Sequence, residues 1–191
     1  MVRGLIIGMC LLAGSVSAQR ELYVRPGLLS SSLTISPTFM LNRDESSYYL
    51  TGFLEGKLDN HLSFRGETHY HVGGSERIPY FKLASRTHFG IQYHLNKGNL
   101  DGYIGLMPGF MITQVNNDFN SLGENPVHVV PSFSTNIGVS YYVWKVVHFF
   151  ANVTYVHSTV NEVRDVNSRA DELMISAGLG FNINAVKQKK K

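Results

Sequence analysis

From residue 20 onward, polar and apolar side chains alternate along most of the chain, and this period-two pattern constrains the fold more than any other feature. In the clearest run, residues 61–72, Leu62, Phe64 and Tyr70 share one face while Arg65 and Glu67 share the other. Successive side chains of a β-strand point to opposite faces, so this run predicts a strand with one apolar and one polar face. A helix would scatter both sets around its circumference.

The same alternation recurs along the chain and predicts eight strands, at 22–28, 48–58, 61–72, 86–95, 100–113, 133–143, 149–156 and 172–183. The segments between these strands alternate in length. Short turns are expected near 58–60, 96–99 and 144–146, and longer polar connections near 31–46, 73–84, 115–131 and 161–170. Tight turns join antiparallel neighbours, so the pattern predicts an up-and-down order with both chain ends beside the short turns.

The composition indicates which face of these strands points outward. Only 16% of the residues are charged, against roughly 25% in typical soluble domains. The polar faces hold mainly Gly, Ser, Asn and His with single charges, and the apolar faces carry aromatic residues toward the strand ends. A soluble sandwich or lipocalin-like barrel would turn its apolar faces inward, whereas a membrane barrel turns them to lipid. We therefore predict an all-β fold, an eight-stranded antiparallel up-and-down transmembrane β-barrel over residues 19–184.

Residues 1–18 have the features of a secretory signal peptide. Arg3 precedes an uncharged apolar stretch from Gly4 to Ala13, and a small-residue site follows that ends at Ala18. The single cysteine, Cys10, lies inside this leader. We expect export, cleavage after Ala18 and a mature chain without disulfides.

The net charge of +3 does not indicate a nucleic-acid partner. Five of the 17 basic residues lie at the two ends: Arg3, Lys187, Lys189, Lys190 and Lys191. The other 12 basic residues are outnumbered by 14 acidic residues. The body of the chain is therefore slightly acidic, and we expect no nucleic-acid binding. Residues 185–191 are predicted to be a solvated basic tail in the periplasm.

The leader, the alternating segments and the closing Gly178–Ile183 resemble the small outer-membrane β-barrels of Gram-negative bacteria, of the OmpA and OmpX kind. The resemblance covers residues 19–184. It implies a place in the outer membrane among its lipids, and recognition of the last strand by the barrel-assembly machinery, which favours a Gly and a final aromatic such as Phe181. The chain departs from that pattern because Asn184 to Lys191 follow the aromatic residue.

Charged residues on the polar faces are expected to meet inside the barrel. We predict a luminal ion-pair network of Arg25, Glu55, Arg65 and Glu67, in which Arg65 lies opposite Phe53, because buried charges must be paired. The alternative is a gated polar pore, although side chains just fill an eight-stranded interior.

Histidines form a second inward group, with His69, His71 and His88 as a candidate cluster. A connection centred near residue 78 would place His69 opposite His88 and His71 opposite Arg86. Paired imidazoles can bind zinc or copper, usually with a third ligand, but Arg86 would repel a cation. We therefore expect hydrogen-bonding histidines, with no metal and no cofactor.

No set of residues predicts catalysis, since the adjacent His157 and Ser158 would point to opposite faces of a strand. We expect a non-enzymatic protein with a structural or surface-interaction role. The candidate contacts to an extracellular partner are Phe119 and Leu122, in the longest connection, although these side chains could instead cap the barrel mouth. A narrow porin or small-solute-binding barrel, and a lipid A-modifying barrel enzyme, remain the alternatives.

Overall fold

The computed structural model describes residues 25–119, 126–160 and 168–185. The predicted leader and all of the predicted tail except Ala185 lie outside these ranges. The strands are β1 (Leu28–Met40), β2 (Ser46–Lys57), β3 (Leu62–Gly74), β4 (Phe81–Lys97), β5 (Leu100–Val115), β6 (His128–Trp144), β7 (Val147–Val160), β8 (Ser168–Arg169) and β9 (Glu172–Asn184), and the 3-10 helix η1 spans Asn117–Phe119. Among the described residues, no helix is long and apolar enough to cross a lipid bilayer.

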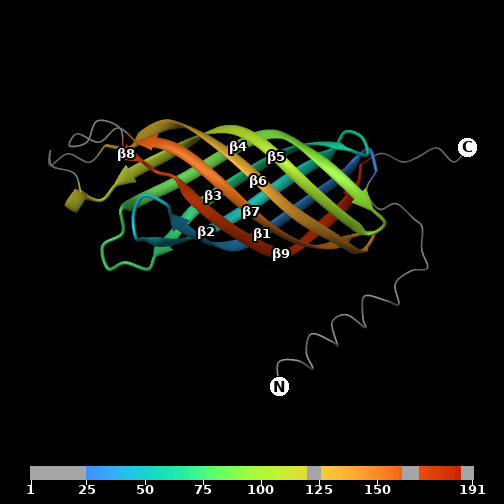
Figure 1. The fold of residues 1–191 in the computed structure, drawn as a ribbon, viewed down its shortest axis with the longest axis horizontal. Helices are drawn as coiled ribbons and strands as arrows, with labels where there is room; N and C mark the ends of the chain where they lie inside the picture. Colours follow the sequence, from blue (N-terminus) through green and yellow to red (C-terminus); the bar gives the residue numbers. More distant parts are fainter. Residues whose placement is uncertain (1–24, 120–125, 161–167, 186–191) are drawn as a thin grey trace, which may run out of the picture.

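The strands form a closed antiparallel barrel. Each strand from β1 to β7 pairs with the next, and β9 pairs with both β7 and β1, which closes the ring (Figure 1). The two-residue β8 continues the pairing of β7 past Glu172, so the barrel itself has the eight strands β1–β7 and β9. The predicted fold class is confirmed.

The two ends of the barrel differ in their connections. At one end the turns are short: Leu58–His61, Gly98–Asn99 and Lys145–Val146 separate consecutive strands. Gly98 adopts φ +64°, a conformation that favours glycine. The longer connections and η1 lie at the other end. The described chain begins and finishes at the short-turn end (Figure 1), where Ala185 N–H donates to the Gly27 carbonyl at 2.9 Å.

The first predicted strand is wrong. We expected a strand at 22–28 and a long connection at 31–46, but β1 runs from Leu28 to Met40 and pairs along its length with β2. The Ser-rich run 30–36 is compatible with a strand because its small hydroxyl side chains alternate between lumen and exterior. The connection to β2 is therefore only 41–45.

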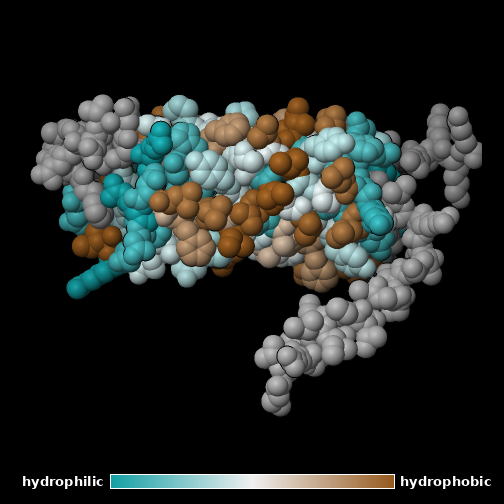
Figure 2. Space-filling model, in the orientation of Figure 1, coloured by the Kyte–Doolittle hydropathy of each residue, from teal (hydrophilic) through white to brown (hydrophobic). Residues whose placement is uncertain are grey.

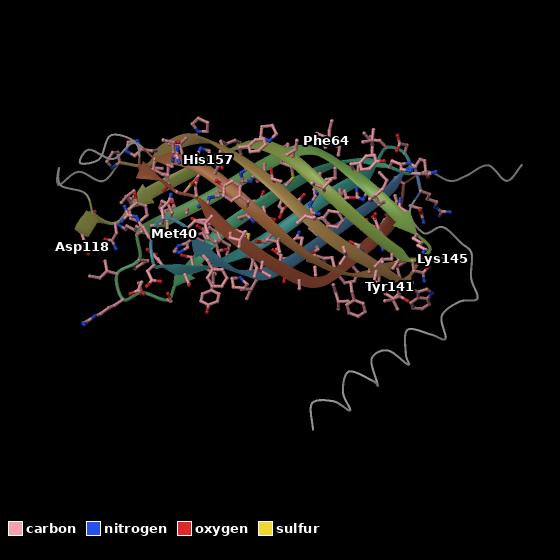
Figure 3. All side chains as sticks on the ribbon, viewed as in Figure 1. Met40, Phe64, Asp118, Tyr141, Lys145 and His157 are labelled. Carbon is pink, nitrogen blue, oxygen red and sulfur yellow. The ribbon has the colours of Figure 1, made fainter. Side chains whose placement is uncertain are left out.

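The apolar faces point outward, as predicted. Leu33, Leu54 and Ile137 are more than 60% exposed, whereas Arg65 and Glu67 are only 1% exposed. On the face drawn in Figure 2, brown apolar residues lie across the middle of the barrel, and teal residues gather toward its two ends. In Figure 3, Phe64 projects from the outside of the wall. This inside-out distribution is the one expected of a barrel surrounded by lipid.

Candidate functional site: the barrel interior

An apolar cluster closes the interior at the end with the longer connections. We call it the apolar cap; its buried members are Met40, Tyr49, Tyr80, Phe81, Ala84, Met111, Val115, Val130, Val160, Ala170 and Met174. These residues lie at or near the ends of strands, and Figure 3 shows Met40 in the half of the barrel that also carries Asp118 and His157. Close-packed side chains leave few voids larger than a water molecule, so the apolar cap separates the interior from this mouth.

The connection 41–45 is held against the apolar cap. The two carboxylate oxygens of Glu45 accept the backbone N–H of Tyr80 at 3.1 and 3.2 Å, and the Arg43 guanidinium lies 3.8 Å from the centroid of the Tyr80 ring. Burial raises the pKa of Glu45, and the nearby charge of Glu172 raises it further. The first two longer connections are thereby joined into one structure.

Near the short turns, a buried lysine lies between two carboxylates. Lys57 Nζ lies 2.9 Å from Glu55 Oε1 and 3.0 Å from Asp101 Oδ2. His94 Nδ1 is 3.0 Å from Asp101 Oδ2, and His94 Nε2 is 2.8 Å from Ser63 Oγ. Each of these side chains is at least nine-tenths buried. The single ammonium of Lys57 thus contacts both carboxylates of this cluster.

Arg65 links this cluster to the middle of the barrel. Its Nη1 is 3.5 Å from Glu55 Oε2 and its Nε is 3.2 Å from Glu67 Oε2. The guanidinium stacks on the Phe53 ring at 3.7 Å from the centroid. The aromatic contact stabilises a cation that is removed from water.

A second ion pair lies beneath the apolar cap. Arg86 Nη1 and Nη2 donate to Glu172 Oε2 and Oε1 at 2.7 and 2.5 Å, and both side chains are fully buried. The Arg86 guanidinium also faces the Tyr49 ring at 4.9 Å. A bidentate arginine–carboxylate pair is among the strongest ionic contacts available to a protein.

The structure places three of the four predicted network residues together and excludes the fourth. Glu55, Arg65 and Glu67 form the contacts above, but Arg25 precedes β1 and its Nε donates to Asn184 Oδ1 at 2.9 Å. Arg25 is excluded because the first strand was assigned too early in the chain. The register was also displaced: Arg65 lies opposite Glu55, not Phe53.

The register shift follows from the turn after β2. Asp59 Oδ1 accepts the backbone N–H of His61 at 2.6 Å and of Leu62 at 2.7 Å. These bonds make a longer turn than the expected 58–60, and each residue of β3 moves two positions along β2. They also lower the pKa of the exposed Asp59 carboxyl.

The predicted histidine cluster is only partly assembled. His69 lies opposite Arg86, not His88, although the His69 and His88 rings are 5.8 Å apart on a diagonal. His71 is opposite Tyr49 and contacts its ring edge-on at 5.4 Å. His69 Nδ1 is 3.1 Å from Thr51 Oγ1, and His88 Nε2 is 2.9 Å from Ser132 Oγ. Within the described residues, no group of three or more His, Cys, Asp or Glu side chains could hold a metal ion.

The two predicted surface contacts belong to the connection between β5 and β6. Phe119 ends η1, and Leu122 lies outside the described residues. On the same end, His157 Nδ1 is 2.5 Å from Asp171 Oδ1 on the exterior, whereas the neighbouring Ser158 is fully buried and lies 2.9 Å from Ser132 Oγ. His157 and Ser158 therefore do point to opposite faces.

Sequence reasoning missed Lys57, Asp101 and Glu172 as members of the ion-pair clusters. Alternation had placed all three on polar faces. Lys57 and Asp101 are 44 positions apart in the chain, and Arg86 and Glu172 are 86 positions apart. Such partners depend on register, which alternation does not supply.

No protein-family model matches the sequence, and no curated protein matches it. Solved structures match its shape. Neisserial surface protein A aligns with a TM-score of 0.59 and 14% identity, over 81% of this chain and 95% of that chain. OprG from Pseudomonas aeruginosa aligns at 0.59 with 10% identity, over 86% and 100%. The N-terminal β-barrel domain of OprF from Pseudomonas aeruginosa aligns at 0.55 with 13% identity, over 83% and 98%.

This chain has the fold of the small outer-membrane β-barrels. In a small outer-membrane barrel of eight strands the interior is just wide enough for side chains to fill. Here the ion-pair clusters and the apolar cap occupy that space. The site is therefore a packed polar interior with an apolar closure at one end.

Proposed function

We propose that this chain is an outer-membrane protein whose barrel is a closed anchor and whose longer connections make contacts outside the cell. The outward apolar band supports insertion into lipid. The observation that carries the proposal is the closure of the interior by Lys57, Arg65, Arg86 and their carboxylates below the apolar cap. A barrel filled in this way presents its connections on a rigid support, and functional contacts concentrate on such loops.

Planar-bilayer recording tests the closed anchor against a narrow porin. The purified full-length mature chain should produce no stepwise current above the lipid baseline, while an open porin recorded in the same bilayers should conduct. Steady unitary steps from this chain would favour the porin and overturn the anchor.

Protease treatment of intact cells tests the orientation. Trypsin should cut at Arg77, which is exposed in the connection 75–80, and should spare Lys97 and Lys145 at the short turns. Cleavage at Lys97 in unbroken cells with Arg77 protected would reverse the topology and end the proposal of surface contacts.

The non-enzymatic part of the proposal is tested separately. Lipid A from a deletion strain should have the same mass spectrum as lipid A from the parent strain. A change in acyl or phosphate groups that the wild-type chain restores would favour the lipid A-modifying enzyme.

A further inference from the structure

The outer wall of the barrel carries an apolar groove across β1–β4. Its volume is about 780 Å³, within the range of small-molecule sites in proteins. The floor of the groove lies at Gly52, Gly56 and Gly66, outward positions of β2 and β3 that have no side chain. The groove therefore exposes bare backbone on a face that is otherwise covered by large apolar side chains.

Large side chains flank the glycines and form the sides of the groove. The strand register aligns these positions in three rows: Leu29, Gly56 and Phe64; Leu54, Gly66 and Phe89; and Leu33, Gly52 and Thr68. The Phe89 ring leans over Gly66, where an added Cβ would meet Phe89 Cδ1 at 3.1 Å. Because the bare positions step between β2 and β3 from row to row, they join into one channel.

The channel is as long as one leaflet of a bilayer is deep. It follows β2 from Leu58, at the short-turn end, to Gly52. A strand rises about 20 Å over this distance, and with a tilt of about 40° it descends about 15 Å through the membrane. This depth is half of the ~30 Å hydrocarbon core. At the inner end, Thr68 Oγ1 and Thr87 Oγ1 lie 3.3 Å apart and satisfy each other.

The chemistry of the groove selects a hydrocarbon chain. Its sides are Leu and Phe, and the backbone groups of its floor belong to strands that are paired on both sides. An occupant therefore gains dispersion contacts there but no hydrogen bond. Where the channel reaches the rim, the rings of His61 and Tyr93 lie 6.0 Å apart, and tyrosine is enriched at the headgroup level of membranes. The occupant is therefore apolar along the channel and polar at the rim.

A second copy of this barrel fits the groove less well than a single chain does. The wall of a closed barrel is convex, and Leu54 and Phe64 project beside the floor with 61% and 50% of their surface exposed. A second barrel would rest on these side chains and leave the floor empty, and a void forfeits the dispersion contacts of its lining. A flexible chain can lie along the floor.

We propose that this groove binds one acyl chain of a glycerophospholipid in the leaflet at the short-turn end, with the headgroup beside His61 and Tyr93. The inference rests on the proposed place in the membrane, because the groove meets lipid only there. It adds to that proposal one lipid molecule that stays with the barrel while the surrounding lipids exchange.

Native mass spectrometry tests the groove. The full-length mature chain is folded into nanodiscs of palmitoyl-oleoyl phosphatidylglycerol and released under activation that strips the surrounding lipids. Wild type should keep one lipid. If wild type does not enter the nanodiscs, the membrane location itself is contradicted, whereas entry without a retained lipid overturns the groove alone. A lipid-free dimer would also overturn it, in favour of a second copy.

Gly56→Leu should fill the channel. An added Cβ at this position meets Leu29 Cδ2 at 3.4 Å, an ordinary contact, so the strand accommodates the change. The lipid-bound fraction should fall about tenfold because the acyl chain loses part of its contacts. Ala151→Leu, at an outward position of β7 on the far side of the barrel, is the matched control and should retain lipid as wild type does. Equal retention by wild type and Gly56→Leu overturns the proposal.

Leu54→Ala is a second variant that lowers one side of the groove without filling it. Because Leu54 is exposed on the wall, this change leaves the packing of the interior intact. It should also reduce the lipid-bound fraction relative to Ala151→Leu. Should Gly56→Leu fail to assemble, unchanged retention by Leu54→Ala overturns the groove.

Discussion

At the scale of single residues, the stability of the barrel interior depends on ion pairs in which both charged partners are present. A buried charge that loses its partner costs far more than the pair contributes, because desolvation is no longer compensated. The bidentate contact of Arg86 with Glu172, fully buried and backed by the Tyr49 ring, is the clearest case.

Arg86→Met should destabilise the barrel by about 3–5 kcal/mol, since Glu172 would remain as an unpaired buried carboxylate. The double variant Arg86→Met with Glu172→Gln should recover much of that loss because no uncompensated charge remains. Urea unfolding of the folded form in lipid vesicles measures both. Equal destabilisation by the single and double variants would contradict the assigned role of the pair.

The Asp59 turn gives a pH-dependent prediction. Hydrogen bonds from His61 and Leu62 lower the pKa of this carboxyl in the folded state, so its stabilising contribution is present above the unfolded value of about 3.9. That contribution is lost as the pH falls through the folded pKa. The urea midpoint of wild type should therefore fall more steeply below pH 4 than that of Asp59→Asn, which cannot titrate. Parallel pH profiles would exclude this role for Asp59.

At the scale of strands, the outward faces decide whether the chain can enter lipid. Leu54→Arg, Phe64→Arg and Ile137→Arg each place a charge on an exposed apolar position of the wall. Arg at the bilayer midplane costs roughly 2–4 kcal/mol, so these variants should lose folded protein in vesicle-insertion assays. Asn60→Arg, at a short turn, is the matched control and should insert normally.

Alternation was sufficient to predict seven of the eight barrel strands and the direction of their faces. The prediction was wrong at β1 because residues 22–28 alternate as clearly as the Ser-rich segment that forms the strand. The small side chains Ser30, Ser32 and Ser36 line the lumen of β1, and a run of serines and a proline in sequence is equally typical of a loop.

Pairing within the interior was less predictable than the faces. Glu55 and Arg65 were expected to share the luminal face, and both lie there. Their pairing differs from the expected one by two positions, because the hydrogen bonds of Asp59 lengthen the turn between β2 and β3. The pairing of Arg86 with Glu172 joins β4 to β9 across the lumen, and no local pattern encodes such a contact. The apolar cap was missed as a unit because its members are single apolar residues on otherwise polar faces, such as Met111 and Met174.

At the scale of the whole molecule, the barrel is closed where its first and last strands meet. Ser36 Oγ and Ser176 Oγ are 2.6 Å apart across this β1–β9 seam, and Ser30 donates to Asn182 at 2.9 Å. These luminal hydroxyls show that the seam is a tight contact and that side chains at 36 and 176 face each other.

A disulfide across this seam should lock the barrel. Ser36→Cys with Ser176→Cys should oxidise spontaneously and raise the free energy of unfolding by about 2–4 kcal/mol. The single native cysteine, Cys10, lies in the predicted leader, and residues 19–191 contain no other thiol that could compete. Non-reducing electrophoresis should show the folded mobility persisting to higher temperature, and reduction should remove the effect. Ser31→Cys with Ser176→Cys, in which position 31 turns away from the lumen, is the control and should not cross-link within one molecule.

The contact between Ala185 and Gly27 has a consequence for the order in which the strands can be connected. The described ends of the barrel touch through a 2.9 Å hydrogen bond, and domains whose ends are close tolerate circular permutation. A short Gly/Ser linker from Ala185 to Gly27, with new termini opened inside the connection 41–45, would keep every strand neighbour. It would also move both ends of the chain to the opposite rim, where a fused reporter domain could be displayed.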